Sequence, residues 1–136
     1  DRDRQKVAGV LDAVDADLTP FSSHGGKLIQ YHGWNDPAIP PRGSIRYHDA
    51  VVQKTADAAG FYRLYMIPGM LHCQGGAGPG QVDWLSILER WVEQNQAPHE
   101  VTASSPSGET QLLCPYPGVA RKSAAGWACS VGKKAG

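Results

Sequence analysis

The sequence has no long apolar run and no excess charge of either sign. None of its 136 residues lies in an apolar stretch that approaches the roughly 20 residues a membrane-spanning helix needs. Thirteen Lys and Arg residues balance thirteen Asp and Glu residues, which gives no electrostatic case for binding nucleic acid or an anionic membrane. With 41% hydrophobic residues at a one-domain length, the composition indicates a globular domain with neither of those partners.

A signal-peptide core and an even number of cysteines are also missing. The opening residues, DRDRQKVAGV, contain no apolar h-region, so either the protein is cytosolic or this is not its true start. Its three cysteines, Cys73, Cys114 and Cys129, are an odd count. In an oxidising compartment one thiol then needs a partner elsewhere, whereas in the cytosol all three can be free. The cysteines alone leave both interpretations open.

Several short catalytic motifs are absent as well. No serine stands in a G-x-S-x-G elbow, and no H-E-x-x-H or C-x-x-C motif is present. The glycine-rich run from Gly75 to Gly80 lacks the Gly-Lys-Ser/Thr of a phosphate loop, and Pro79 removes a backbone donor from it. The nucleophile of a hydrolase and the phosphate cradle of a nucleotide-binding protein are therefore both missing from these 136 residues.

The sequence does contain two strand-like runs, each followed by a loop with a titratable side chain. Lys27 to His32 precedes Asp36, and Phe61 to Ile67 precedes His72. Ser44 can cap a helix that runs between them to about Ala59, so the order is that of a right-handed βαβ crossover in an α/β fold. The inward stripe of this helix is predicted to comprise Ile45, His48, Val51, Val52, Thr55 and Ala59.

The crossover leads to a geometric prediction for the two loop residues. Neighbouring parallel strands lie about 5 Å apart, and their carboxyl ends share one edge of the sheet, where ligands bind in such folds. We therefore expect a carboxylate oxygen of Asp36 to lie about 2.6–3.2 Å from one ring nitrogen of His72. An acid that orients a histidine is two-thirds of a nucleophilic triad.

The flanking segments are predicted from periodicity. A helix over Arg4 to Val14 should turn Val7, Val10, Leu11 and Val14 toward the core. A helix from about Gln81 to Ala97 should bury Val82, Leu85, Leu88 and Val92, with Trp84 and Trp91 at the flanks of that stripe. Val101–Ala103 and Gln111–Leu113 indicate a hairpin. The region 99–136 is otherwise expected to be irregular, and a Cys114–Cys129 staple explains how its tail is held.

Three stretches carry a resemblance to a known family. They are KLIQYHGWNDPAIPP, FYRLYMIPGMLHCQGGAGP and LCPYPGVAR, within roughly Phe21 to Cys129. Together they resemble the C-terminal part of the tannase and feruloyl esterase family of secreted α/β-hydrolases, which includes bacterial aryl-ester hydrolases acting on terephthalate monoesters. The resemblance implies that Asp36 is the acid and His72 the base of a Ser-His-Asp triad. It also implies that Cys73 is a half-cystine whose partner lies upstream.

The same resemblance implies what else the chain is. Residues 1–136 would be the C-terminal part of an α/β-hydrolase catalytic domain: the last parallel strands with their crossover helix, then a disulfide-stapled tail. The nucleophile strand, the oxyanion hole and the lid, which often binds calcium in the family, would lie outside it, so no cofactor is expected here. The implied protein is secreted or periplasmic, acts on a small aromatic ester, needs the upstream part of the same protein, and has Trp34, Ile39 and Leu71 as candidate substrate contacts.

Two other functions remain open from the residues alone. One is a non-catalytic binding or interaction module, since a chain of this length can fold and bind without chemistry. The other is a metal site built from His32, Asp36 and His72, with His24 as a further ligand. If the esterase interpretation is right, residues 1–136 in isolation should not turn over an activated aryl ester, because the nucleophile and the oxyanion donors are missing.

Overall fold

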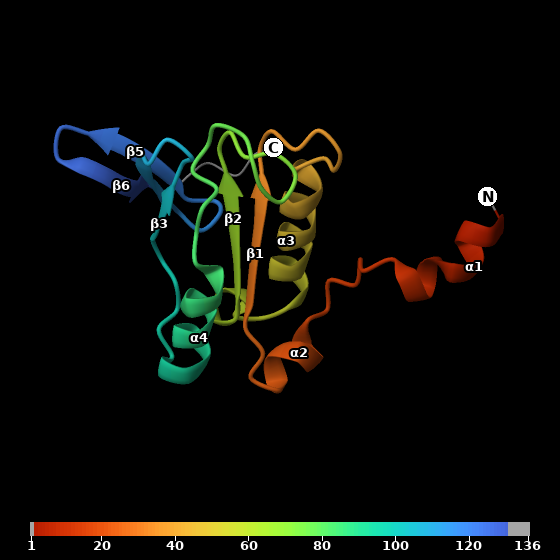
Figure 1. Cartoon of the computed structure of the whole chain (residues 1–136). Coiled ribbons are helices and arrows are strands. Elements are labelled where there is room, and N and C mark those ends of the chain that lie inside the picture. Colours follow the sequence, from red (N-terminus) through yellow and green to blue (C-terminus); the bar gives the residue numbers. More distant parts are fainter. Residues whose placement is uncertain (1, 131–136) are drawn as a thin grey trace.

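The computed structural model describes residues 2–130 (Figure 1). The elements in chain order are α1 (Arg2–Leu11), α2 (Thr19–Ser23), β1 (Leu28–Gly33), α3 (Arg42–Lys54), η1 (Ala58–Gly60), β2 (Tyr62–Ile67), α4 (Trp84–Gln94), β3 (Val101–Ser104), β4 (Thr110–Leu113), β5 (Val119–Ser123) and β6 (Gly126–Ser130). No helix among these residues is long and apolar enough to cross a membrane.

The centre of the molecule is the predicted βαβ unit. β1 and β2 pair in parallel, with Leu28 opposite Tyr62 and Gly33 opposite Ile67, and α3 connects them. Residues of β2 alternate between two cores: Tyr62 and Leu64 pack with α3, whereas Tyr65 and Ile67 pack on the side of α4. A strand covered on both faces needs apolar residues at successive positions, which explains the nearly continuous apolar run.

The crossover helix differs from its prediction at both ends. It begins at Arg42 with Pro41 as its N-cap and ends at Lys54, so the expected cap at Ser44 and the expected end near Ala59 are wrong. The buried stripe contains Ile45, His48, Val51 and Thr55 as predicted, but Val52 and Ala59 are exposed. Thr55 adopts an extended backbone, and this ends the helix before its periodicity reaches Ala59.

The N-terminal helix does not pack as predicted. α1 lies well away from the sheet in Figure 1, and its apolar stripe of Val7, Val10 and Leu11, with Val14 beyond it, is exposed, Val10 to 86%. An amphipathic pattern identifies which face of a helix is apolar, but it does not identify the surface that covers that face. The prediction that this helix contacts the core is therefore wrong for the described residues.

Helix α4 buries a different face from the predicted one. Trp91 is buried and Trp84 and Ile87 pack on the core. Of the predicted stripe, Val82 packs on the core and Leu88 is half-buried, whereas Leu85 and Val92 are exposed. Trp84 stacks on Tyr31 of β1 at a ring-centroid distance of 5.1 Å and an interplanar angle of 8°. The large area of two indoles outweighs the aliphatic stripe, because an aromatic ring buries more surface than a Leu or Val side chain.

The C-terminal region is more regular than predicted. β3 and β4 form the expected antiparallel hairpin, but β5 and β6 form a second hairpin where an irregular tail was expected. The Cys114–Cys129 disulfide is present, with a Cα–Cα distance of 5.8 Å, and connects the end of β4 to β6. The predicted region extends to residue 136, and its last six residues lie outside the described part of the chain.

Candidate active site

Backbone hydrogen bonds hold the loop after β1 against the end of β2. The Trp34 amide donates to the Ile67 carbonyl at 2.9 Å, and the Asn35 amide donates to the Met70 carbonyl at 3.1 Å. Gly33 is buried at this junction and lies close to the carbonyl groups of Met70 and Leu71. The loop that carries the acid is therefore attached to the loop that carries the histidine.

The loop after β2 is compact and places His72 at its tip. The Leu71 amide donates to the Gly75 carbonyl at 3.1 Å, and the Gln74 amide donates to the His72 carbonyl at 2.7 Å. Gly75 and Gly76 have positive φ angles, which glycine adopts without a steric penalty. Cys73 also has a positive φ, of 60°, which is uncommon for a residue with a side chain.

The two loops bring Asp36 and His72 into direct contact. Nδ1 of His72 lies 2.7 Å from Oδ2 of Asp36, within the range predicted from the parallel strands. The Asp36 side chain is only 2% exposed, whereas that of His72 is 52% exposed. The acid is thus buried behind a histidine that faces outward, and the geometric prediction is confirmed.

Four donors surround the Asp36 carboxylate. Oδ1 accepts hydrogen bonds from the backbone amides of Ala38 at 2.8 Å and Ile39 at 2.9 Å. Oδ2 faces His72 and also Nε2 of His32, which lies at 3.1 Å. Burial works to raise the pKa of Asp36, but the two amides and the hydrogen bond and charge of His72 outweigh it, so this pKa lies well below its usual range. Asp36 is ionised at neutral pH.

An ionised Asp36 determines the tautomer of a neutral His72. The carboxylate can only accept, so Nδ1 of His72 carries the proton and Nε2 carries the lone pair. Within residues 2–130, Nε2 of His72 has no hydrogen-bond partner. A half-exposed imidazole in this tautomer can take a proton through Nε2 while the carboxylate stabilises the imidazolium that forms.

The other predicted site residues lie in the same two loops, and Ile39 contacts Asp36 through its backbone amide. Trp34, Ile39 and Leu71 are all exposed. Trp34 lines a cavity of about 210 Å³ whose other lining residues include neither Asp36 nor His72. Cys73 is exposed and has no disulfide partner among the described residues.

No group of three His, Cys, Asp or Glu side chains in residues 2–130 is arranged to hold a metal ion. His24 hydrogen-bonds with the Pro20 carbonyl in α2 instead of joining the pair. His32 does join it, but sequence reasoning considered this residue only as a metal ligand. The four-residue spacing between His32, near the end of β1, and Asp36, in the loop that follows, could have predicted their contact.

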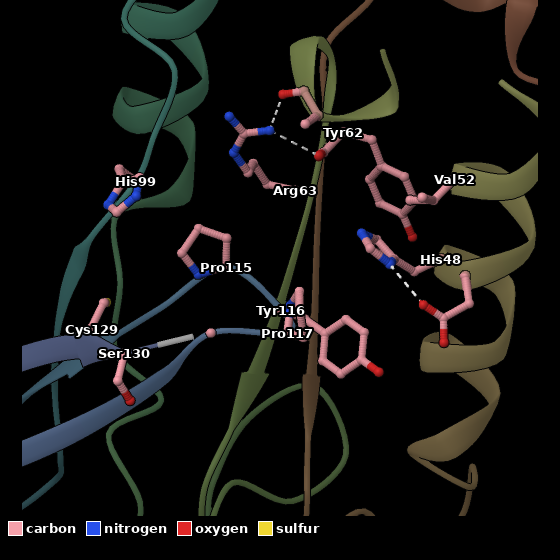
Figure 2. A pocket seen from close by; sticks show the side chains of 13 residues that line it. His48, Val52, Tyr62, Arg63, His99, Pro115, Tyr116, Pro117, Cys129 and Ser130 are labelled. Atoms are coloured by element: carbon pink, nitrogen blue, oxygen red, sulfur yellow. Dashed lines mark hydrogen bonds and ion pairs between the residues drawn. The ribbon is translucent and has the colours of Figure 1, made fainter. Parts of the chain in front are cut away.

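A separate cavity of about 410 Å³ lies on the α3 side of the sheet (Figure 2). His48 and Tyr62 face Tyr116 across it, and none of its lining residues comes from the loops that carry Asp36 and His72. The His48 ring packs edge-on against Tyr116 at 5.4 Å and is buried, as predicted for a core or boundary histidine. This cavity is therefore not part of the candidate active site.

Comparison with known proteins gives consistent matches. A family model described as tannase and feruloyl esterase matches residues 1–133. Mono(2-hydroxyethyl) terephthalate hydrolase of Piscinibacter sakaiensis is 39% identical over an alignment of 121 residues, and the match covers 84% of this chain and 20% of that protein. Tannase of Aspergillus oryzae is 40% identical over an alignment of 124 residues, and the match covers 79% of this chain and 21% of that protein.

A solved structure shows the same arrangement of elements. The crystal structure of feruloyl esterase B from Aspergillus oryzae superposes with a TM-score of 0.79 at 27% identity, over 86% of this chain and 29% of that one. The chain spans about a fifth to a quarter of the length of the curated relatives it matches. Since the family model covers nearly the whole chain, the chain belongs to the tannase and feruloyl esterase family.

Proposed function

We propose that this chain supplies the acid and the base of the Ser-His-Asp triad of a carboxylic ester hydrolase. The observation that carries the proposal is the 2.7 Å contact between His72 Nδ1 and a buried, ionised Asp36 carboxylate. Membership of a family of named esterases supports the same reaction class. No G-x-S-x-G elbow is present in this sequence, so the proposal places the nucleophilic serine in another part of the same α/β-hydrolase, together with the oxyanion donors and the lid.

The proposed mechanism assigns one step to each ring nitrogen of His72. Nε2 takes the proton of the serine hydroxyl as the serine oxygen attacks the ester carbonyl, and then gives that proton to the departing alkoxide. Asp36 holds Nδ1 and stabilises the positive charge while the proton is on the ring. The resulting acyl-enzyme is hydrolysed by a water molecule that His72 activates in the same way.

The substrate proposed is a small ester of an aromatic acid. Two relatives are named as a feruloyl esterase and a terephthalate hydrolase, and both names denote aromatic acids. In this chain Trp34, Ile39 and Leu71 present apolar side chains on the loops that carry Asp36 and His72. We assign them to the substrate-facing surface, where they would contact the acyl ring.

We further propose an oxidising compartment and a second covalent link. The Cys114–Cys129 disulfide fits a secreted or periplasmic protein. Cys73 follows the proposed base directly and is exposed, which suits a disulfide to a cysteine upstream of this chain. Such a bond would tie the histidine loop to the segment that carries the serine.

The test uses the full-length protein that contains this chain. With an activated aryl ester such as a p-nitrophenyl ester, we expect a burst of p-nitrophenol that equals the enzyme concentration, and we expect His72→Ala to abolish it. The control is His24→Ala, which removes an exposed histidine whose only hydrogen bond given by the structure is to Pro20.

A burst that survives His72→Ala would overturn the base assignment. A folded full-length protein that lacks ester turnover but still binds aromatic esters would favour the non-catalytic binding module. Isolated residues 1–136 should show no turnover, because the base and the acid cannot act without a nucleophile.

A further inference from the structure

We propose that His32 is a positioning residue, which orients the Asp36 carboxylate by donating a second imidazole N–H to the oxygen that His72 uses. The catalytic meaning of this inference rests on the proposed esterase function. Its geometric basis does not, because the hydrogen bonds around His32 determine the direction of each donor independently of any substrate.

His32 is the last side chain of β1 before the acid loop, and it is 12% exposed. Nε2 lies 3.1 Å from Asp36 Oδ2 and 3.3 Å from the Ile39 carbonyl oxygen. Nδ1 lies 2.7 Å from Ser44 Oγ in the first turn of α3. The ring thus connects the acid loop to the crossover helix.

The partners of Nε2 decide its protonation. An ionised carboxylate and a backbone carbonyl can only accept hydrogen bonds, so Nε2 must carry a proton. In the neutral ring Nδ1 is then an acceptor, and the Ser44 hydroxyl donates to it. With Nδ1 protonated instead, the Nε2 lone pair would face two acceptors in a mostly buried site, which is unfavourable.

Two further residues extend this hydrogen-bond chain behind Ser44, and each of them also donates in the direction of Asp36. Ser44 Oγ accepts from Nε2 of Gln30 at 2.9 Å, and the Tyr62 hydroxyl donates to Oε1 of Gln30. Every member thus donates toward the carboxylate, and a run of hydrogen bonds aligned in this way polarises its members cooperatively. The network therefore directs a strong donor at one oxygen of the proposed triad acid.

This donor matters because the two carboxylate oxygens have different roles. Backbone amides hold Oδ1, whereas the two imidazoles are the donors to Oδ2 among the described residues. His72 is half-exposed and depends on Asp36 for its own orientation, so it cannot fix that carboxylate by itself. The two amides at Oδ1 limit rotation of the carboxylate about its Cβ–Cγ bond, and the His32 donor fixes the position of Oδ2 within that limit. Without His32, Oδ2 and the His72 ring can shift together.

The experiment compares His32→Leu with His32→Gln in the full-length protein. The amide nitrogen of Gln can occupy the place of Nε2 and donate to Asp36, whereas Leu cannot donate. We expect His32→Leu to lower kcat about 10–100-fold with KM within about twofold, because small misplacements of catalytic groups have effects of this size. We expect His32→Gln to recover most of kcat.

A spectroscopic measurement separates this inference from the proposed function. The Nδ1–H proton of His72, bonded to a carboxylate, should give a low-field NMR resonance, which we expect His32→Leu to shift or broaden. His24→Leu is the matched control, because His24 has no described contact with Asp36. A wild-type protein without esterase activity would contradict the proposed function, and the resonance would still decide the role of His32.

Two results would overturn the inference. One is a folded His32→Leu protein with wild-type kcat and an unchanged His72 resonance. The other is equal loss of kcat in the Leu and Gln variants, which would show that ring shape matters and the donated proton does not. If His32→Leu does not fold, Ser44→Ala decides: we expect a smaller fall in kcat with a shifted resonance, and no change in either would refute the role of the network.

Discussion

Gly33→Ala should separate the proposed acid from the proposed base without touching either residue. Gly33 ends β1, and the loops that follow β1 and β2 meet at its α-carbon. A Cβ at this position would lie 2.7 Å from the Met70 carbonyl carbon and closer still to the carbonyl oxygens of Met70 and Leu71. Those atoms are backbone, so no side-chain rotation relieves the overlap.

The size of the effect follows from this distance. Non-bonded carbons rest at about 3.5–4.0 Å, so the histidine loop must retreat by about 1 Å. A displacement of that size at the Asp36–His72 contact lowers kcat about 100-fold. Overpacking of a buried position costs about 1–3 kcal/mol of unfolding free energy, so the variant should still fold.

The assay is burst and steady-state turnover of a p-nitrophenyl ester by the full-length variant, together with its urea unfolding curve. Gly43→Ala is the control, because a Cβ there meets only the far end of the Arg46 side chain, at 4.0 Å. A folded Gly33→Ala enzyme with wild-type kcat would refute the reasoning, since it would show that the two loops need not stay in contact for the reaction.

Four further outcomes are expected. Asp36→Asn should lower kcat by about 10⁴-fold in the ester assay, because an amide neither enforces the tautomer of His72 nor stabilises its imidazolium. The lowered pKa of Asp36 makes this carboxylate stabilise the fold above about pH 4, an effect lost as pH falls through the folded-state pKa. Urea titrations should therefore show the difference in unfolding free energy between wild type and Asp36→Asn shrinking as the pH is lowered below about 4. Replacing Cys114 and Cys129 by Ala should lower the unfolding free energy by about 3 kcal/mol for a sequence separation of 15 residues, as measured by denaturation. Non-reducing peptide mapping of the full-length protein should find Cys73 joined to a cysteine outside residues 1–136, and a Cys73 link to Cys114 or Cys129 would contradict this.

The sequence was sufficient to predict the two parallel strands and the contact between Asp36 and His72 at their carboxyl ends. Two apolar runs with a helix between them have few ways to pair, because the crossover is right-handed and both strands then point the same way. Asp36 and His72 each lie only a few residues beyond the end of β1 or β2, so their side chains can reach each other at the shared edge of the sheet. The strand pairing therefore predicts that Asp36 and His72 lie within hydrogen-bond distance, as they do.

Apolar periodicity was less successful in predicting which residues of α1 and α4 are buried, because burial also depends on the surface against which a helix packs. In α4 the aliphatic stripe of Leu85 and Val92 lies outward because Trp84 and Trp91 occupy the side of the sheet. Counting apolar positions gives a Leu the same weight as a Trp, although a Trp side chain buries the larger area. In α1 the stripe was identified correctly, but its partner surface is not among residues 2–130.

The network behind Asp36 was missed because one serine suited two roles equally well. Ser44 has the residue type of a helix cap, and in that role its oxygen would accept from a backbone amide of its own helix, with its side chain directed along the helix and not toward β1. In the structure the N-cap of α3 is Pro41, three residues before Ser44, and the Ser44 hydroxyl points across to β1, where it meets His32 and Gln30. A hydroxyl proton can be donated in only one direction, so a serine that donates to His32 cannot also donate elsewhere. The direction of every hydrogen bond in the chain from Tyr62 to Asp36 depends on that single proton. The packing of α3 against β1 places the Ser44 hydroxyl where it donates to His32, and the local sequence does not encode this packing.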